Sequence, residues 1–249
     1  MKVEVKAPAK INLTLDVVGK RTDGYHDIST IMQAVDLYDI ITLEDNDSGA
    51  VTVSCNYDGI PCDDSNICAK AAYRFFDYCK TDVKGVHIDI NKTIPAQAGL
   101  AGGSSDGAAV ILGLNVLFDS MLKPAEMHAI AERVGADVPF CLEGGTMLAT
   151  GIGTVLKKMP SFNCSSIVIC KADDVSVSTT EAYKKVNALN PHTSYTDEMI
   201  KALDKVTPGI ASDETLLYGV EVKFYSNKVV VNDKFETNIK NLRVMGDGA

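Results

Sequence analysis

The sequence has no surplus of basic side chains, no apolar segment long enough to span a membrane and no apolar leader. Asp and Glu number 33 against 24 Lys and Arg, which gives a net charge of −9 over 249 residues. A nucleic-acid surface needs clustered Lys and Arg to displace counterions, so this balance argues against a nucleic-acid partner. The longest apolar run, Ala108–Phe118, is too short to cross a bilayer, and lysines at positions 2, 6 and 10 break any leader pattern. We therefore expect a cytoplasmic protein with no membrane partner.

Cysteine pairs are also missing, since none of the seven cysteines belongs to a C-x-x-C motif. An odd number of cysteines without that spacing lacks the usual zinc and redox signatures and favours free thiols in a reducing compartment. The hydrophobic share of 46% and the charged share of 23% exclude a disordered chain. A globule of this length buries roughly three quarters of its unfolded surface, which is enough for a sizeable core. The length itself predicts one large domain or two smaller ones.

The apolar periodicity predicts a mixture of strands and helices along the whole chain. The strands expected in the first half are Val3–Ala7, Ile11–Val17, Ile28–Gln33, Ile40–Glu44, Val51–Cys55 and Val86–Ile90. The helices expected there are Asn66–Lys80 (capped by Asp64 or Ser65), a buried and almost chargeless run over Gly107–Phe118, and one from Lys123-Pro124 to Gly135. After a boundary near Lys158–Cys164, strands are expected near Ile167–Lys171, Val220–Tyr225 and Val229–Val231, with helices near Thr179–Leu189 and Thr196–Lys205.

The most unusual segment is Ile94–Asp106, in which a glycine- and serine-rich stretch precedes the buried helix. Glycines let the backbone approach a ligand closely, and the free N–H groups of a first helical turn suit a polyphosphate. No Gly-Lys-Ser/Thr follows and G-x-G-x-x-G is missing, so this is neither a Walker loop nor a dinucleotide loop. Ser104 and Ser105 can bind phosphate oxygens or a metal ion, and the alternative is a tight turn with a serine cap. Asp106 would repel phosphate, so we expect it to complement the helix dipole.

A short strand near the N-terminus presents two polar side chains on one face. Lys10 and Asn12 alternate with Ile11 and Leu13, so if the apolar pair faces the core, the polar pair points into solvent or a cleft. Taken alone, a lysine on a polar strand face is usually solvated.

Two turns add further candidates. Tyr25 and His26 follow the turn signal Asp23-Gly24. Such a pair can stack on a flat ring and bond its edge, or it can be a core tyrosine beside an exposed histidine. Asp137 precedes Pro139 and looks like a helix N-cap, whereas the sharper alternative is a catalytic carboxylate beside a lysine.

The order of four motifs is more informative than any one of them. Pro-Ala-Lys-Ile-Asn-Leu at 8–13 is followed by Asp-Gly-Tyr-His at 23–26, Gly-Leu-Ala-Gly-Gly-Ser-Ser-Asp at 99–106 and Gly-Ala-Asp-Val-Pro-Phe at 135–140. This order resembles the GHMP small-molecule kinase family over about residues 1–185. The resemblance implies transfer of the γ-phosphoryl group of ATP, with Mg²⁺, to an alcohol. The second and fourth motifs point to members that phosphorylate the 2-hydroxyl of a cytidine diphosphate methylerythritol in isoprenoid synthesis.

The resemblance also assigns the catalytic and ATP-binding residues. Lys10 and Asp137 match the family's catalytic pair. The segment that matches the family's ATP phosphate-binding loop, called the phosphate loop below, consists of Pro95, Ala96, Gln97, Ala98, Gly99, Leu100, Ala101, Gly102, Gly103, Ser104 and Ser105.

A third set of residues matches the family's site for the cytidine of the substrate. These residues are Asn12, Tyr25 and His26. The later segment Val175–Tyr183 resembles one whose final aromatic stacks on the cytosine, which makes Tyr183 a further candidate.

The fold implied by the resemblance is α+β in two domains. A domain resembling a ribosomal-protein module is expected over residues 1–160, and a ferredoxin-like α+β domain over residues 161–249. Gln97 and Ala101 stand where glycine is common in the family. Family members carry a late glycine-serine loop and a final strand, whereas this sequence ends at Arg243–Ala249, so we expect the second domain to be incomplete.

Three other functions remain open at this point. Another GHMP kinase would act on homoserine, mevalonate or a sugar, but those substrates have no base for Tyr25 to stack on. A weakened nucleotide-binding relative fits the shortened C-terminus, but the presence of both Lys10 and Asp137 opposes it. A nucleic-acid module is suggested only by the fold and conflicts with the net charge of −9. The oligomeric state and the metal ligands stay open.

Overall fold

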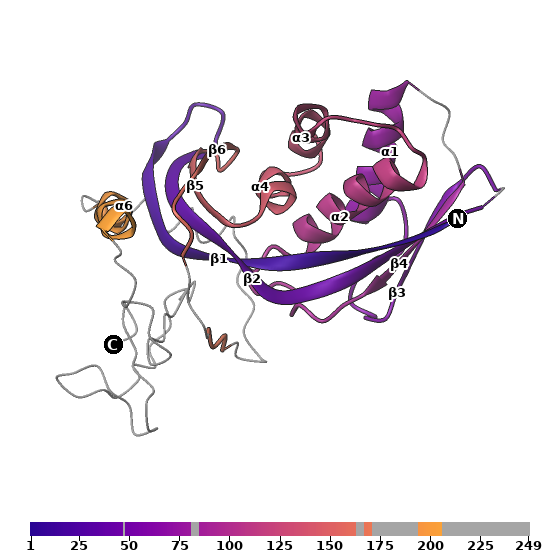
Figure 1. Cartoon of the computed structure of the whole chain (residues 1–249), viewed down its shortest axis with the longest axis horizontal. Helices are drawn as coiled ribbons and strands as arrows, with labels where there is room; N and C mark the ends of the chain where they lie inside the picture. The colour runs from indigo at the N-terminus through magenta and orange to yellow at the C-terminus, as the bar shows by residue number, and fades with distance from the viewer. Residues whose placement is uncertain (47, 81–84, 163–166, 171–193, 206–249) are drawn as a thin grey trace.

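A six-stranded sheet with helices over one face organises the computed structural model, which describes residues 1–46, 48–80, 85–162, 167–170 and 194–205. The strands are β1 (Lys2–Lys20), β2 (His26–Asp45), β3 (Val51–Cys55), β4 (Val86–Asn91), β5 (Thr146–Gly151) and β6 (Val155–Lys158). Helices α1 (Ile67–Cys79), α2 (Gly102–Leu117), α3 (Pro124–Glu132) and α4 (Val138–Glu143) lie over the same side of the sheet (Figure 1). The α6 helix (Tyr195–Lys205) packs against β1 and β2 outside their curled end, on the side away from α4 (Figure 1).

The two longest strands form the frame of the sheet. The strands predicted at Val3–Ala7 and Ile11–Val17 are confirmed as parts of one strand, β1, which pairs antiparallel with β2 along nearly its whole length. Register shifts between Pro8 and Lys10 and between Asn12 and Thr14 re-aim the side chains in this stretch. The other edge of β2 carries β4 and β5 one after the other, so β2 is central.

The buried helix predicted after the glycine-rich segment is α2, and it lies on the sheet. It begins at Gly102, five residues before the predicted start, because the glycines and serines form its first turn. Gly113 allows the close packing, since a Cβ there would lie 1.9 Å from Cδ1 of Leu43 on β2. The main core lies between α2, α1 and the sheet and includes Phe75 and Ile111.

The helix ends differ from prediction in two places. The N-cap of α1 is Asn66, not Asp64 or Ser65, because the Asn66 Oδ1 accepts from the Cys68 N–H at 2.8 Å. The start of α3 at Pro124 is confirmed, but the helix ends at Glu132, before Gly135.

The later part of the chain is described only in pieces. The predicted helix Thr196–Lys205 is confirmed as α6, whereas Ile167–Cys170 run without regular structure, so the strand predicted there is wrong for these residues. The other predicted elements of residues 161–249, and Tyr183, lie outside the described residues. Among the described helices, none combines the length and the hydropathy of a membrane span.

Candidate active site

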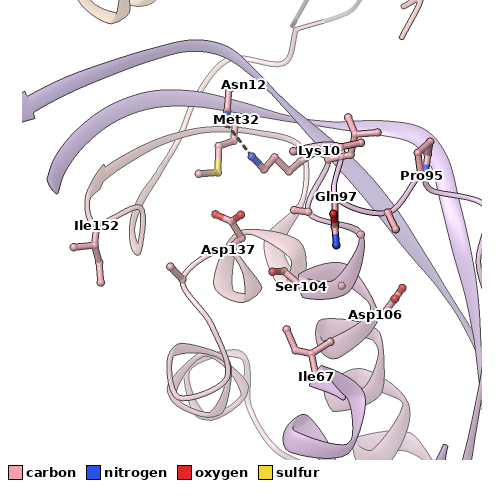
Figure 2. A pocket seen from close by; sticks show the side chains of 18 of the residues that line it. Lys10, Asn12, Met32, Ile67, Pro95, Gln97, Ser104, Asp106, Asp137 and Ile152 are labelled. Carbon is pink, nitrogen blue, oxygen red and sulfur yellow. Dashed lines mark hydrogen bonds between the residues drawn. The ribbon is translucent and has the colours of Figure 1, made fainter. Parts of the chain in front are cut away.

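One cavity of about 1130 Å³ gathers most of the residues singled out from the sequence. It lies beside the N-terminus of α2 and is bordered by β1, β2, the β1–β2 turn and the segment before α4 (Figure 2). The predicted site residues that line it are Lys10, Asn12, Tyr25, His26, Asp137 and every member of the phosphate loop except Ser105.

Lys10 is buried inside this cavity wall and is not a solvated surface lysine. The residue is 6% exposed, and its Nζ donates to the Asn12 Oδ1 at 3.3 Å. Ile11 packs into a separate apolar cluster with Leu100 of the phosphate loop. The alternation predicted for this strand is therefore confirmed, and the polar face borders a cleft.

The phosphate loop has a left-handed backbone at three alternate positions. The φ angles are +54° at Gln97, +72° at Gly99 and +55° at Ala101. This region favours glycine, which explains physically why glycine is common where this chain has Gln97 and Ala101. The left-handed residues turn the chain so that the last part of the loop, Gly102–Ser105, forms the first turn of α2.

The two serines of the loop have different surroundings, and neither caps α2. The N-cap is Ala101, whose methyl group has no oxygen to offer the N–H groups of the first turn. Ser104 lines the cavity, whereas Ser105 is buried and its Oγ donates to the Pro8 carbonyl at 2.7 Å. The serine-cap interpretation is therefore wrong, and the N-terminus of α2 faces the cavity without a capping side chain.

Asp137 occupies the N-cap position of α4 but makes no capping hydrogen bond. Its backbone is helical, with φ −87° and ψ −13°, whereas a capping residue has an extended backbone. Figure 2 shows its carboxylate directed into the space below Lys10 and Met32. The predicted position is thus confirmed, and the predicted capping contact is not formed.

The Tyr25–His26 turn forms the rim of the cavity. Arg21 braces this turn through ion pairs with Asp23 at 2.9 Å and Asp27 at 3.1 Å, and the Arg21 guanidinium lowers the pKa of Asp23. Tyr25 is 62% exposed, so the core-tyrosine interpretation is wrong, and His26 is half-buried on the cavity wall.

A buried ion network lies behind the phosphate loop and was missed in the sequence. The Lys92 ammonium donates to Asp39 on β2 and to Asp106 on α2. Burial, offset only in part by Lys92, raises the pKa of Asp106 to about 7. Asp106 is therefore one partner of a buried network, and its predicted role with the helix dipole is wrong. The available signals were a charge at Asp39, between Tyr38 and Ile40, and a charge at Asp106, directly before the almost chargeless run of α2.

No group of three or more His, Cys, Asp or Glu side chains that could hold a metal ion occurs within the described ranges. Of the carboxylates that line the cavity, Asp23 is paired with Arg21 and Asp106 with Lys92. Asp137 is the one carboxylate of these three for which the described residues form no ion pair.

A sheet covered by helices, with a glycine-rich loop leading into a buried helix, is the arrangement expected of a GHMP kinase, and the comparisons show that class. The family "GHMP kinases N terminal domain" matches residues 66–145. The 4-diphosphocytidyl-2-C-methyl-D-erythritol kinase of Acetivibrio thermocellus is 44% identical over 235 residues, which are 93% of this chain and 81% of the relative. The kinase of that name from Clostridioides difficile is 44% identical over 209 residues, 81% of this chain and 69% of the relative. The chain therefore belongs to the 4-diphosphocytidyl-2-C-methyl-D-erythritol kinase family of ATP-dependent GHMP kinases.

Solved structures give the same fold. A crystal structure of a 4-(cytidine 5'-diphospho)-2C-methyl-D-erythritol kinase matches with a TM-score of 0.62 and 30% identity over 82% of this chain and 72% of that one. A homoserine kinase from Cytophaga hutchinsonii matches with a TM-score of 0.57 at 20% identity, which shows the shared fold alone.

Proposed function

We propose that this chain transfers the γ-phosphoryl group of ATP to the 2-hydroxyl of 4-diphosphocytidyl-2-C-methyl-D-erythritol. The observation that carries the proposal is a single cavity that joins the uncapped N-terminus of α2, the Lys10–Asn12 strand face, Asp137 and the Tyr25–His26 turn. A phosphate site, two candidate catalytic groups and an aromatic rim therefore border the same space.

The ATP phosphates bind on the backbone of the phosphate loop and the first turn of α2. The N–H groups at a helix N-terminus and its positive dipole end attract a polyphosphate. Ser104 adds a hydroxyl from the cavity wall. Mg²⁺ in phosphoryl-transfer sites is held largely by the substrate phosphates, and the Ser104 hydroxyl on the cavity wall is the candidate protein ligand here. When bound, Mg²⁺ neutralises charge on the phosphate oxygens.

Lys10 and Asp137 act on the two ends of the transfer. The acceptor oxygen attacks the γ-phosphorus, the bond to the β–γ bridging oxygen breaks, and ADP leaves. Asp137 orients the acceptor hydroxyl or accepts its proton, while Lys10 stabilises negative charge at the transferred group. The Asn12 Oδ1 accepts a hydrogen bond of 3.3 Å from the Lys10 ammonium. Asn12 therefore also helps to position the ammonium group in the cavity.

The cytidine end of the substrate binds at the rim. A cytosine has two flat faces and an edge with an amino donor and two acceptors. Tyr25 supplies a stacking face, and His26 supplies polar groups for the edge. Tyr183 is proposed for the other face, and it lies outside the described residues.

The division into domains is part of the same proposal. Residues 1–160 form the domain that holds the phosphate loop, and residues 161–249 contribute a second, ferredoxin-like α+β domain that brings Tyr183 to the base. The division rests on the resemblance to the family and on the position of the cavity at the Tyr25–His26 turn.

A coupled ADP-release assay tests the function directly. The purified chain is given Mg²⁺-ATP with each of four acceptors in turn: the cytidine diphosphate methylerythritol, mevalonate, homoserine and galactose. We expect ADP release above the ATP-only background with the cytidine compound alone. Turnover of another acceptor at a higher kcat/KM would assign a different GHMP kinase activity. ATP binding without turnover of any acceptor would favour the weakened nucleotide-binding relative.

A further inference from the structure

Three charged side chains from distant parts of the chain meet behind the phosphate loop, and none of them belongs to the family's catalytic pair. Lys92 follows β4, Asp39 lies in β2 and Asp106 lies in α2. The side chains of Lys92, Asp39 and Asp106 are 5%, 0% and 3% exposed. Burying charges away from water is costly unless they are paired, so such a cluster needs a structural or functional reason.

Asp39 holds the entry of the phosphate loop. Its Oδ1 accepts from the backbone N–H groups of Thr93 at 2.5 Å and Ile94 at 2.8 Å, directly before Pro95. Its Oδ2 accepts from the Lys92 ammonium. One carboxylate thus fixes both the backbone and the lysine at the point where the loop leaves the sheet.

Lys92 connects this entry to the exit of the loop. Its Nζ donates to the Asp106 Oδ2 at 2.8 Å, within the first turns of α2. The ammonium also lies against Gly102, the first residue of α2, since a Cβ there would be 3.0 Å from Nζ. The two ends of the loop are therefore joined by one side chain.

Asp106 retains an oxygen that this bridge does not use. Its Oδ1 is buried and has no hydrogen-bond partner among the residues that the structure describes. Lys92 and Asp106 both line the cavity, and Figure 2 shows the Asp106 carboxylate on the side of α2 away from Asp137. The network therefore lies beside the two ends of the phosphate loop, across α2 from Asp137, and is separate from the residues proposed to act on the acceptor.

We propose that Lys92, held by Asp39 and Asp106, is a positioning residue that keeps the two ends of the phosphate loop at the spacing required to bind ATP. The proposal rests on the proposed function, because it concerns the same ATP site. A loop with three left-handed residues and no capping side chain at its helix has few local restraints, so a bridge across its ends sets its shape. A loop that is already ordered in this shape loses less conformational entropy when it binds phosphate, which is a functional reason to keep buried charges.

The test compares variants that break the bridge with one that keeps it. In Lys92→Met/Asp106→Leu, both bridging groups become apolar, and Asp39 keeps its two backbone donors. Asp106→Leu breaks only the second half of the bridge, and Asp106→Asn keeps an acceptor for Lys92. The measurements are KM for ATP, KM for the acceptor, kcat, the thermal midpoint, and hydrogen exchange of residues 93–105 with and without a non-hydrolysable ATP analogue and Mg²⁺.

We expect the double variant to raise KM for ATP about tenfold or more, because small displacements of a binding loop have large effects. KM for the acceptor should stay near the wild-type value. The protection that the ATP analogue gives to residues 93–105 should be lost. Asp106→Asn should have a KM for ATP close to the wild-type value, whereas Asp106→Leu should have a raised one. A loss of core packing alone does not predict this difference. If the double variant does not fold, the Leu and Asn single variants decide by the same criteria.

Two results would overturn the proposal. One is a double variant, or Asp106→Leu, with wild-type KM for ATP and full protection of the loop. The other is an Asp106→Asn variant as impaired as Asp106→Leu. If the ATP analogue fails to protect the loop in the wild-type chain itself, the ATP site and the proposed function fail together with this inference.

Discussion

The backbone N–H of Lys10 donates to the carbonyl of Leu100 at 3.0 Å, which joins the strand of the candidate catalytic lysine to the phosphate loop. Lys10 lies at a register shift of β1, where the strand leaves its regular pairing with β2 and has a donor to spare for the loop. The Ser105 Oγ makes a second link, to Pro8. Two hydrogen bonds therefore hold the phosphate loop to the strand that carries the candidate catalytic lysine.

Asp137→Asn should lower kcat by about 10² to 10⁴ and leave both KM values nearly unchanged, because a carboxylate that assists proton transfer is lost. Asp137 makes no capping hydrogen bond to α4, so exchanging its carboxylate for an amide of the same shape should leave the start of that helix unchanged. Steady-state kinetics and the thermal midpoint are the measurements. A near-normal kcat would remove Asp137 from the chemistry.

The two serines of the phosphate loop should separate ATP binding from stability. Ser104→Ala should raise KM for ATP with little change in the thermal midpoint, because its hydroxyl lines the cavity. Ser105→Ala should lower the free energy of unfolding by about 1 kcal/mol, because the buried bond to Pro8 is lost. Its effect on KM for ATP should be the smaller one. The reverse pattern would show that Ser105 contacts the nucleotide.

Tyr25→Ala should raise KM for the cytidine substrate and spare KM for ATP. Stacking on a base is worth roughly 1–3 kcal/mol, which corresponds to a rise of about 5-fold to 150-fold. Tyr57→Ala is the matched control, since Tyr57 is also exposed but does not line the cavity. His26→Ala should lower the ratio of kcat/KM for the cytidine substrate to kcat/KM for its uridine analogue. Equal KM values in Tyr25→Ala and Tyr57→Ala would place the base elsewhere.

Ala101→Gly should stabilise the fold by about 0.5–1 kcal/mol, because φ at this position is +55° and glycine adopts that backbone without a Cβ clash. Ala98→Gly is the control. Ala98 is not among the residues with positive φ, so glycine there should destabilise. Urea unfolding of the three proteins measures the difference. A destabilised Ala101→Gly would mean that the left-handed turn is not strained.

Asp106 should make the free energy of unfolding depend on pH. Its pKa is raised from an ordinary 3.8 to about 7 in the folded chain. A raised folded pKa contributes stability that is complete below the unfolded pKa and is lost as the pH rises through the folded pKa. Lys92 stays protonated in this range, since its pKa is raised above 10.5.

The unfolding free energy of Asp106→Asn should therefore rise relative to wild type between pH 5 and pH 8, by more than about 1 kcal/mol. Asp63→Asn is the control. The pKa of Asp63 is lowered by its bonds from Ser65, so its contribution changes only below pH 3.8 and the difference should be flat from pH 5 to pH 8. A flat difference for Asp106→Asn as well would show that this carboxyl keeps an ordinary pKa.

The pattern of residues predicted the order and type of most of the described elements, but it did not predict the strands β5 and β6. Strand alternation in β1, the buried apolar face of α1 and the position of Pro124 at the start of α3 depend on residues close together in the chain, so local periodicity predicted them. The four ordered motifs identified the family for the same reason, since each is a contiguous run of letters. The start of α2 was misplaced because glycine and serine carry weak helix preferences and only the packing on the sheet forms that turn.

Which side chains share the site, and which partners they have, depends on how distant parts of the chain pack together. Ser104 and Ser105 are adjacent and chemically identical, yet one lines the cavity and the other bonds Pro8, 97 residues earlier. Asp39 and Lys92 meet across 53 residues because β2 and β4 pair in one particular register. Both Asp106 and Lys10 are buried. Burial makes Asp106 a partner in an ion bridge, and it places Lys10 in the wall of the cavity and not on a solvated surface. Such partners depend on strand register and helix packing over long separations, which no local pattern of residues contains.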